Sequence, residues 1–199
     1  MTQVLHLSSS IFGENSKSNR LAATFVDRLQ AQGAGVNVTR RDLADDAVPH
    51  LSGAAFQAFS TPAVDRTPEQ QQLTALSDAL VEELQRSDTI VLGLPMYNFG
   101  IPSSLKAWID HVARAGLTFQ YTANGPQGLL TGKKLYVFAT RGGQYLGTPL
   151  DTQSQYIRDF FAFLGVQDVE FVYAENLARP GLQDESLEAA NADIAALAI

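Results

Sequence analysis

The sequence contains no cysteine, which excludes disulfide bonds, thiolate nucleophiles, iron–sulfur clusters and cysteine-ligated zinc. Histidine is also scarce, and His6, His50 and His111 form no i, i+4 pair of the kind that binds a metal on one helix face. No apolar run approaches the roughly 20 residues of a membrane-spanning helix. Residues 1–7 lack the basic flank and long apolar region of a signal peptide. We therefore expect a cytoplasmic protein that needs neither a metal nor a membrane.

Positive charge is in deficit as well. The chain has 14 Lys and Arg residues against 21 Asp and Glu residues, a net charge of −7, and no basic stripe that would displace counterions from nucleic acid. What the chain does have is length and apolar content. Its 199 residues are 45% hydrophobic and 18% charged, which is typical of a globular protein with its own core. We expect residues 1–199 to form a single domain with no nucleic-acid partner.

Strand and helix patterns alternate along the whole chain. Short apolar or alternating segments predict five strands, at 4–8, 36–40, 89–94, 134–139 and 169–173. Apolar spacing and capping residues predict the helices, at 16–32, 51–59, from 67 through at least 84, at 102–116, 152–164 and 184–197. This order favours an α/β fold, a doubly wound five-stranded parallel sheet with helices on both faces.

Two further local expectations follow from the sequence. Thr67, Pro68 and Gln70 have the spacing of a capping box with proline at the first helical position, and Leu73, Leu76, Leu80 and Leu84 should form one apolar face of the helix that follows. Residues 119–130 are too long for a plain connection, and their Asn-Gly-Pro segment predicts a small hairpin flap.

Ligands of such folds bind outside the carboxyl ends of the strands, at the point where strand order reverses. That rule selects the loops after Ser8, Leu94 and Ala139. The first loop, 8–18, carries five serines, some of them beside a helix N-terminus whose unpaired amides favour an anion. Serine is also an ordinary N-cap residue. Because neither G-x-G-x-x-G nor a P-loop occurs, the serines favour the phosphate of a mononucleotide in a flavodoxin-like fold.

The other two loops suit the ring of such a ligand. Residues 95–102 place Tyr97, Asn98 and Phe99 after a buried strand, where aromatic walls and edge hydrogen bonds suit a flat ring, although both aromatics would also suit a core. Residues 140–144 contain Gly142 and Gly143, which let main-chain amides approach a ligand or simply form a tight turn. Convergence of the three loops at one sheet edge favours the ligand interpretation.

These segments resemble the bacterial FMN-dependent NADH azoreductase and NADH:quinone oxidoreductase family over essentially the whole chain. The most specific stretches are Pro-Met-Tyr-Asn-Phe at 95–99 and Arg-Gly-Gly at 141–143, supported by Ser-Lys-Ser-Asn at 16–19. Lys17 stands where glutamine is expected, and Thr140 stands where serine is common. The 59–61 segment lacks an arginine that some relatives carry near the substrate.

The resemblance implies FMN as the cofactor, NADH or NADPH as the electron donor, and a homodimer with two FMN sites near the subunit interface. It assigns the following cofactor contacts: Ser10, Ser16, Lys17 and Ser18 for the phosphate, and Met96, Tyr97, Asn98, Phe99, Thr140, Arg141, Gly142 and Gly143 for the flavin ring. It places Tyr121 and Phe163 on the substrate side.

The implied activity is a ping-pong transfer of hydride from the nicotinamide to FMN and then to a quinone or an azo compound. Because the flavin carries the chemistry, no catalytic side chain is required. Arg141 or the amides of Gly142 and Gly143 are candidates to stabilise charge on the reduced ring. The alternative is a flavodoxin-like one-electron carrier. A hydrolase is disfavoured, since Ser103 and Lys106 fit S-x-x-K but no accompanying motif occurs.

Overall fold

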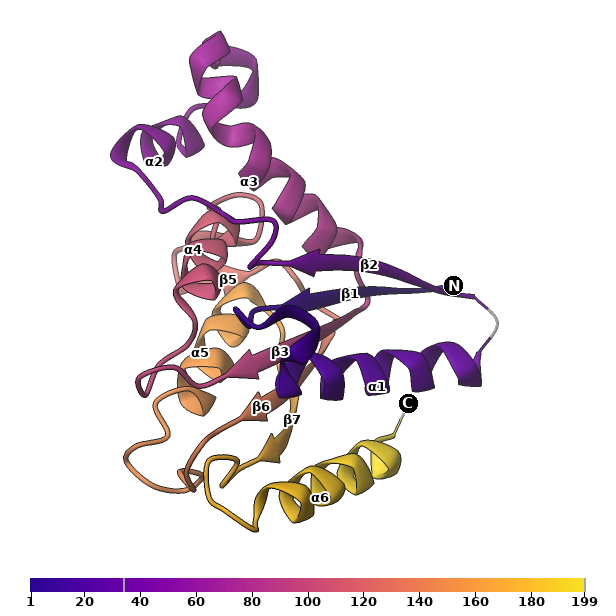
Figure 1. The fold of residues 1–199 in the computed structure, drawn as a ribbon. Coiled ribbons are helices and arrows are strands. Elements are labelled where there is room, and N and C mark those ends of the chain that lie inside the picture. The colour runs from indigo at the N-terminus through magenta and orange to yellow at the C-terminus, as the bar shows by residue number, and fades with distance from the viewer. Residues whose placement is uncertain (34, 199) are drawn as a thin grey trace.

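The computed structural model describes residues 1–33 and 35–198. Five parallel strands form its main sheet: β1 (Thr2–Ser8), β2 (Val36–Asp42), β3 (Thr89–Pro95), β6 (Lys134–Thr140) and β7 (Asp168–Ala174), in the order β2-β1-β3-β6-β7 (Figure 1). The order reverses between β1 and β3, because the chain leaves β1 for β2 and then returns to the other side of β1. The predicted doubly wound parallel sheet is therefore confirmed.

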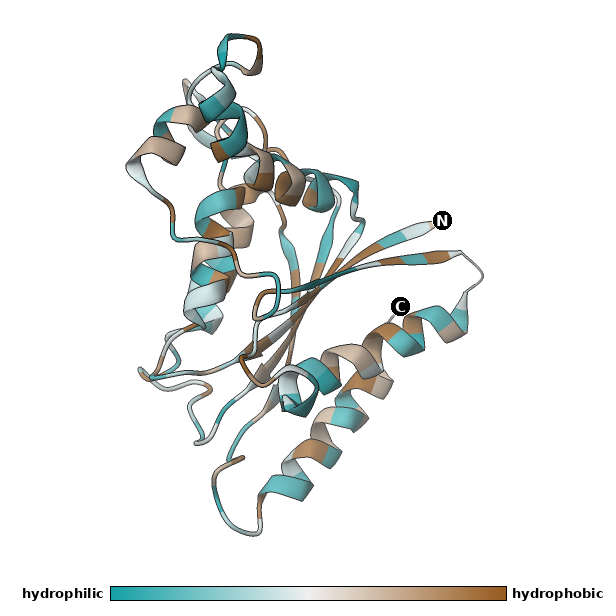
Figure 2. Ribbon diagram, turned by 45° about the horizontal axis from the view of Figure 1, so that its top comes forward, coloured by the Kyte–Doolittle hydropathy of each residue, from teal (hydrophilic) through white to brown (hydrophobic). Residues whose placement is uncertain are grey.

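Helices cover both faces of this sheet. α1 (Lys17–Gln32) and α6 (Gln183–Ala196) pack on one face, and α3 (Pro68–Arg86), α4 (Ser103–Val112) and α5 (Ser154–Leu164) pack on the other. Residues of β1 alternate between the two cores, since Val4 joins the α1–α6 side while Leu5 and Leu7 join the other. Figure 2 shows hydrophobic residues concentrated along the central strands and hydrophilic residues on the outer parts of the helices.

The short elements lie outside these layers. The 3₁₀ turns η1 (Gly13–Asn15) and η2 (Ala63–Asp65) precede α1 and α3, and α2 (Gly53–Phe59) packs against α3. Figure 1 shows α2 and the beginning of α3 projecting beyond the sheet. None of the helices in 1–33 and 35–198 combines the length and apolarity needed to cross a bilayer.

Most local expectations are confirmed. Thr67 caps α3 with the reciprocal bonds of a capping box to Gln70. The predicted apolar face of α3 is wrong at its first member: Leu80 and Leu84 are fully buried, but Leu73 is 39% exposed. Leu73 is the sixth residue of α3, and the beginning of this helix projects beyond the sheet (Figure 1).

The expected hairpin also forms. β4 (Phe119–Thr122) and β5 (Gly125–Gly128) pair antiparallel, with Gly125 at a positive φ of 107°. Gly128 lies against the end of α5 so closely that a Cβ there would meet backbone atoms of Leu164 and Gly165 at 2.1–2.4 Å. The hairpin is thus fixed to the carboxyl end of α5, at the opposite end of that helix from the strand carboxyl ends.

Candidate functional site

The carboxyl ends of β1, β3 and β6 are adjacent in the sheet, so the three selected loops meet beside the reversal of strand order. A cavity of about 230 Å³ lies between them. Its lining comes from all three loops and from the loop after β7: Ser10, Phe12, Asn15, Ser16, Lys17, Pro95, Met96, Tyr97, Thr140, Arg141, Gly142 and Leu177.

The start of α1 offers this cavity hydrogen-bond donors. Ser16 is the N-cap, and its Oγ accepts from the amide of Asn19 at 3.3 Å and lies 3.0 Å from Oγ of Ser18. The amides of Lys17 and Ser18 have no acceptor within the described part of the chain. Lys17 adds a cation that pairs with no carboxylate among those residues. The helix start therefore presents free amides, a hydroxyl and an ammonium group, which together suit a phosphate.

Gly93 of β3 lets α1 approach the sheet at this point. A Cβ at position 93 would lie 2.9 Å from Oδ1 of Asn19 and 3.3 Å from backbone atoms of Ser18. Any larger residue would push the amides of the helix start away from the cavity.

The loop after β3 is held in a strained turn. Tyr97 and Gly100 exchange two backbone hydrogen bonds, and Asn98 and Phe99 between them have φ values of 50° and 62°. Positive φ at both central residues is the geometry of a type I′ turn. The side-chain amide of Gln153, which is fully buried, donates to the carbonyls of Pro95 and Gly100 at 2.9 Å each. Gln153 thus supports the whole turn from behind.

Tyr97 connects this turn to the first loop. Its hydroxyl lies 2.9 Å from Oγ of Ser10, and its ring meets Phe12 edge-on, with 6.3 Å between ring centroids. In the same turn, Phe99 meets Tyr145 edge-on at 5.7 Å. The rings of Phe12 and Tyr97 therefore line the cavity, as suits a flat apolar ligand.

Arg141 does not present a free charge to this cavity. Its guanidinium, which is almost fully buried, donates to Asp151 at 2.7 Å, to Ser154 at 2.9 Å and to Glu175 at 3.2 Å. Burial raises the pKa of Asp151, but hydrogen bonds from Ser154 and Arg141 outweigh that effect and lower it, so the carboxylate stays ionised. Two carboxylates thus already compensate this arginine.

Free main-chain donors remain in the same loop. Glu175 accepts from the amides of Tyr145 and Leu146 at 2.8 and 2.9 Å, which ties the loop after β6 to the end of β7. The amides of Gly142 and Gly143 find no acceptor in the described ranges. Of the two candidates named from the sequence, the geometry favours these amides over Arg141 as donors to a reduced ring.

The structure brings most of the expected cofactor residues together. Those that line the cavity are Ser10, Ser16, Lys17, Met96, Tyr97, Thr140, Arg141 and Gly142. Ser18, Asn98, Phe99 and Gly143 belong to the same three loops without lining it.

Tyr121 and Phe163 lie elsewhere. Tyr121 belongs to the hairpin, and Phe163 packs on Phe119 at 4.5 Å near the end of α5. Gln153, just before α5, contacts the cavity loops, and the 11 residues of α5 then span about 16 Å. The hairpin is therefore no flap over the cavity of its own chain.

Sequence reasoning missed several contributors. Phe12 and Asn15 lie in the serine-rich loop, where the serine hydroxyls gave the stronger signal. Leu177 follows β7, an edge strand whose loop the switch-point rule does not select, and its amide donates to the carbonyl of Arg141 at 3.1 Å. Gln153 acts on backbone carbonyls, and no motif signals such a contact.

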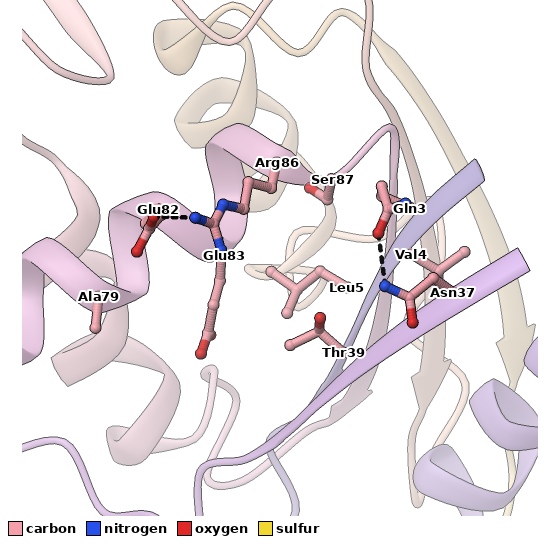
Figure 3. Close-up of a pocket in the computed structure, with 10 residues that line it drawn as sticks. All are labelled: Gln3, Val4, Leu5, Asn37, Thr39, Ala79, Glu82, Glu83, Arg86 and Ser87. Carbon is pink, nitrogen blue, oxygen red and sulfur yellow. Dashed lines mark hydrogen bonds and ion pairs between the residues drawn. The ribbon is translucent and has the colours of Figure 1, made fainter. Parts of the chain in front are cut away.

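Another cavity, of about 370 Å³, lies at the amino end of β1 beside the end of α3 (Figure 3). Its charges are already paired, Arg86 with Glu82 and Glu83 with Arg41, and Gln3 bonds to Asn37. It offers a ligand little uncompensated charge and lies at the wrong end of the strands for this fold.

Comparison with known proteins agrees with this geometry. Residues 2–198 match a family described as having the flavodoxin-like fold. Two proteins named FMN-dependent NADH:quinone oxidoreductase are similar: one from Cellvibrio japonicus, 50% identical over 98% of this chain and 97% of its own, and one from Alcanivorax borkumensis, 55% identical over 87% and 88%. A solved FMN-dependent NADH-azoreductase from Bacillus anthracis, in complex with FMN, superposes with a TM-score of 0.87 at 26% identity over 98% of this chain and 96% of its own.

Proposed function

The chain belongs to the family with the flavodoxin-like fold, and on this premise we propose that it is an FMN-dependent oxidoreductase that passes electrons from NADH to quinones and azo compounds. Two NADH:quinone oxidoreductases about half identical to this chain support the quinone activity, and the FMN-bound azoreductase supports the second substrate class. NADPH is a second possible donor, to be compared directly with NADH. Work in the cytoplasm belongs to the same proposal.

One observation of the structure carries the cofactor assignment. A single cavity at the strand-order reversal is lined by Lys17, Gly142 and Tyr97, and the amides of Lys17, Gly142 and the adjacent Ser18 have no acceptor among the described residues. The amides of Lys17 and Ser18 suit a phosphate at a helix start, and Gly142 and Tyr97 suit a flat ring with polar edges. Donors of these two kinds match the phosphate and the ring of FMN.

The residues divide the work as follows. Ser10, Ser16, Lys17 and Ser18 bind the phosphate, with the helix start supplying two amides. Met96, Tyr97, Asn98 and Phe99 hold one side of the ring, and Thr140 to Gly143 hold its edge. When bound, FMN would supply the two-electron hydride chemistry that links the nicotinamide donor to the acceptor. The amides of Gly142 and Gly143 donate hydrogen bonds to the ring edge where negative charge develops.

A ping-pong order is part of the proposal. Donor and acceptor would use the same exposed side of the site in turn, because the protein side of the site is occupied by the three loops. The rings of Phe12 and Tyr97, which line the cavity, would help to exclude water from the bound ring.

We also propose that the active form is a homodimer. Tyr121, 76% exposed on the hairpin, and Phe163 lie about one helix length from the cavity of their own chain. Their proposed place on the substrate side therefore requires that they reach the cavity of a second copy. A two-fold dimer allows this exchange in both directions.

The test begins with the purified protein, FMN and each nicotinamide. We expect a bound yellow chromophore, steady oxidation of NADH with a quinone, and decolourisation of an azo dye. Absence of FMN binding would refute the proposal, and FMN binding without multiple turnovers would favour the one-electron carrier instead.

A charge reversal tests the phosphate site. Lys17→Glu should weaken FMN binding by at least tenfold, because a carboxylate replaces the unpaired ammonium beside the phosphate. Folding should not suffer, since an acidic residue in the first turn of α1 is favourable. The control is Arg86→Glu, the same charge change at the amino ends of the strands, which should leave FMN affinity within twofold.

A further inference from the structure

A further cavity, of about 290 Å³, lies between the connection from α2 to α3 and the turn after α4. Phe59 and Arg66 line it from the connection, and Arg114 and Gly116 line it from the turn. It shares no lining residue with the proposed cofactor cavity, from which α4 separates it by most of its length.

Arg66 and Arg114 share a single carboxylate. Nη1 of Arg114 donates to Oδ1 of Asp78 at 2.9 Å, and Nη1 of Arg66 donates to Oδ2 of the same residue at 2.8 Å. The arginine side chains are 2% and 10% exposed for Arg114 and Arg66 respectively, so both are essentially withdrawn from water. No other carboxylate in 1–33 and 35–198 pairs with either of them.

The charges of this cluster do not balance. Two guanidinium groups and one carboxylate leave one positive charge, and a buried charge without a partner is costly. Phe59 covers one face of Arg114, with the guanidinium carbon 4.0 Å from the ring centroid, which offsets part of that cost. Burial lowers the pKa of Arg114, Asp78 raises it, and Arg66 lowers it again, which agrees with this excess of positive charge.

Donors of both arginines remain free. Arg114 makes its side-chain hydrogen bonds to Ser77 and Asp78 through Nη1 alone, and Arg66 uses Nε and Nη1 for Thr61, Thr74 and Asp78. Nε and Nη2 of Arg114 and Nη2 of Arg66 have no acceptor among the described residues. These donors are therefore available to a ligand in the cavity that both side chains line.

We propose that Arg66 and Arg114 form a binding site for a phosphate-type oxyanion. Such an anion can accept from two guanidinium groups at once and brings the negative charge that the cluster lacks. The cavity of Figure 3 lacks such an excess of positive charge, because every arginine and glutamate that lines it is already paired. In a chain of net charge −7, an anion is held where positive charge exceeds negative charge locally.

The experiment uses protein saturated with FMN, so that inorganic phosphate cannot enter the cofactor site. Thermal unfolding is followed while sodium phosphate replaces sodium chloride at constant ionic strength. We expect the Tm to rise by about 2–4 °C as the site fills. Arg66→Gln should lose that rise. Arg86→Gln, the same change at an exposed arginine that is paired within α3, should keep it.

The arginine Nε–H signals of the unaltered protein locate the ligand without any substitution. Phosphate should shift the signals of Arg66 and Arg114, whether or not FMN binds as proposed. Repeating the titration with NAD⁺ and NADP⁺ distinguishes a nucleotide phosphate from free phosphate. If either nucleotide shifts these signals and Arg66→Gln abolishes the shift, the result supports the site. A Tm that does not respond to phosphate, a rise that Arg66→Gln retains, or unmoved signals of both arginines would overturn it.

Discussion

At the scale of single residues, backbone strain is concentrated in the turn that follows β3. Asn98 and Phe99 both adopt positive φ, and for a bulky residue such as Phe99 this costs about 1–2 kcal/mol relative to an ordinary conformation. Glycine would avoid that cost, yet the chain has an aromatic side chain there, 51% exposed and facing Tyr145. Strain of this kind persists where the side chain serves a function.

Phe99→Gly should therefore separate stability from function. Without cofactor, we expect the free energy of unfolding to stay level or rise by up to about 1 kcal/mol, because relief of strain offsets the lost contact with Tyr145. FMN affinity and the rate of quinone reduction should both fall. Urea unfolding of the cofactor-free protein and fluorescence titration with FMN measure the two effects, and a marked loss of stability would show that the turn is not strained.

The support behind the turn gives a second prediction at this scale. Gln153→Met keeps the shape of the side chain but removes both donors to Pro95 and Gly100, and should lower the free energy of unfolding by about 1–3 kcal/mol. FMN affinity should fall as well, because the turn loses its anchor. Gln155→Met, an exposed position two residues along, is the control. Equal FMN affinity in both variants would remove Gln153 from the positioning residues.

His6 gives the stability of the protein a defined pH dependence. Burial, and then the neighbouring Arg40, lower the pKa of His6 from 6.5 to about 4. Between these values the unfolded chain binds a proton that the folded chain does not, so stability falls as pH drops below about 6.5. His6→Asn keeps an acceptor for Arg40 but has no titrating group at this position. Between pH 6.5 and pH 5, its free energy of unfolding should fall by about 2 kcal/mol less than that of the parent protein. Urea unfolding at both pH values measures this, with His50→Asn as the control. Equal losses of unfolding free energy in His6→Asn and the parent protein would contradict the prediction.

Side-chain roles were the part of the site least visible in the sequence. The hydroxyls of Ser10 and Ser16 could be named from their place before a helix start, because amides and helix dipole act locally. The ion pairs of Arg141 could not be predicted, because its partners Asp151 and Glu175 come from segments 10 and 34 residues away. Long-range ion pairs of this kind leave no periodic signal.

At the scale of elements, α1 is positioned by its contact with β3. Gly93→Ala should weaken FMN binding by at least tenfold, because the added Cβ would meet Asn19 and Ser18 and displace the amides of the helix start. Gly53→Ala at the start of α2, where a Cβ meets nothing within 4 Å, is the control. FMN titration and a melting curve are needed for each variant. Unchanged affinity in Gly93→Ala would mean that the helix start does not hold the phosphate.

Elements with strong local signals were predicted close to their observed bounds. The capping box set the start of α3, and the apolar run at 89–94 set β3, because both depend on neighbouring residues. The face of α3 was harder to predict. Leu73 has the right spacing for burial, but whether a helix extends beyond the edge of its sheet depends on the tertiary arrangement. The hairpin is a similar case. Its turn could be predicted from neighbouring residues, but its packing against the end of α5 could not.

At the scale of the whole molecule, α5 separates two parts of the proposed site. Its amino end adjoins the cavity loops through Gln153, and its carboxyl end carries the hairpin through the contact of Gly128 with Gly165. Tyr121 is exposed on the hairpin and does not line its own chain's cavity, which is the arrangement that the proposed dimer requires.

Mixing two defective variants tests this directly. Lys17→Glu impairs the cofactor site but keeps Tyr121, whereas Tyr121→Ala keeps the cofactor site, and each alone should have low quinone reductase activity. Random re-pairing of equal amounts makes about half of the dimers mixed, and each of these holds one site with both parts intact, so about a quarter of the parent activity should return. The assay compares the mixture, after dissociation and reassociation, with the mean of the separate variants. Activity equal to that mean would show that Tyr121 does not act across a subunit boundary, while FMN binding by Tyr121→Ala shows independently that its own cofactor site is sound.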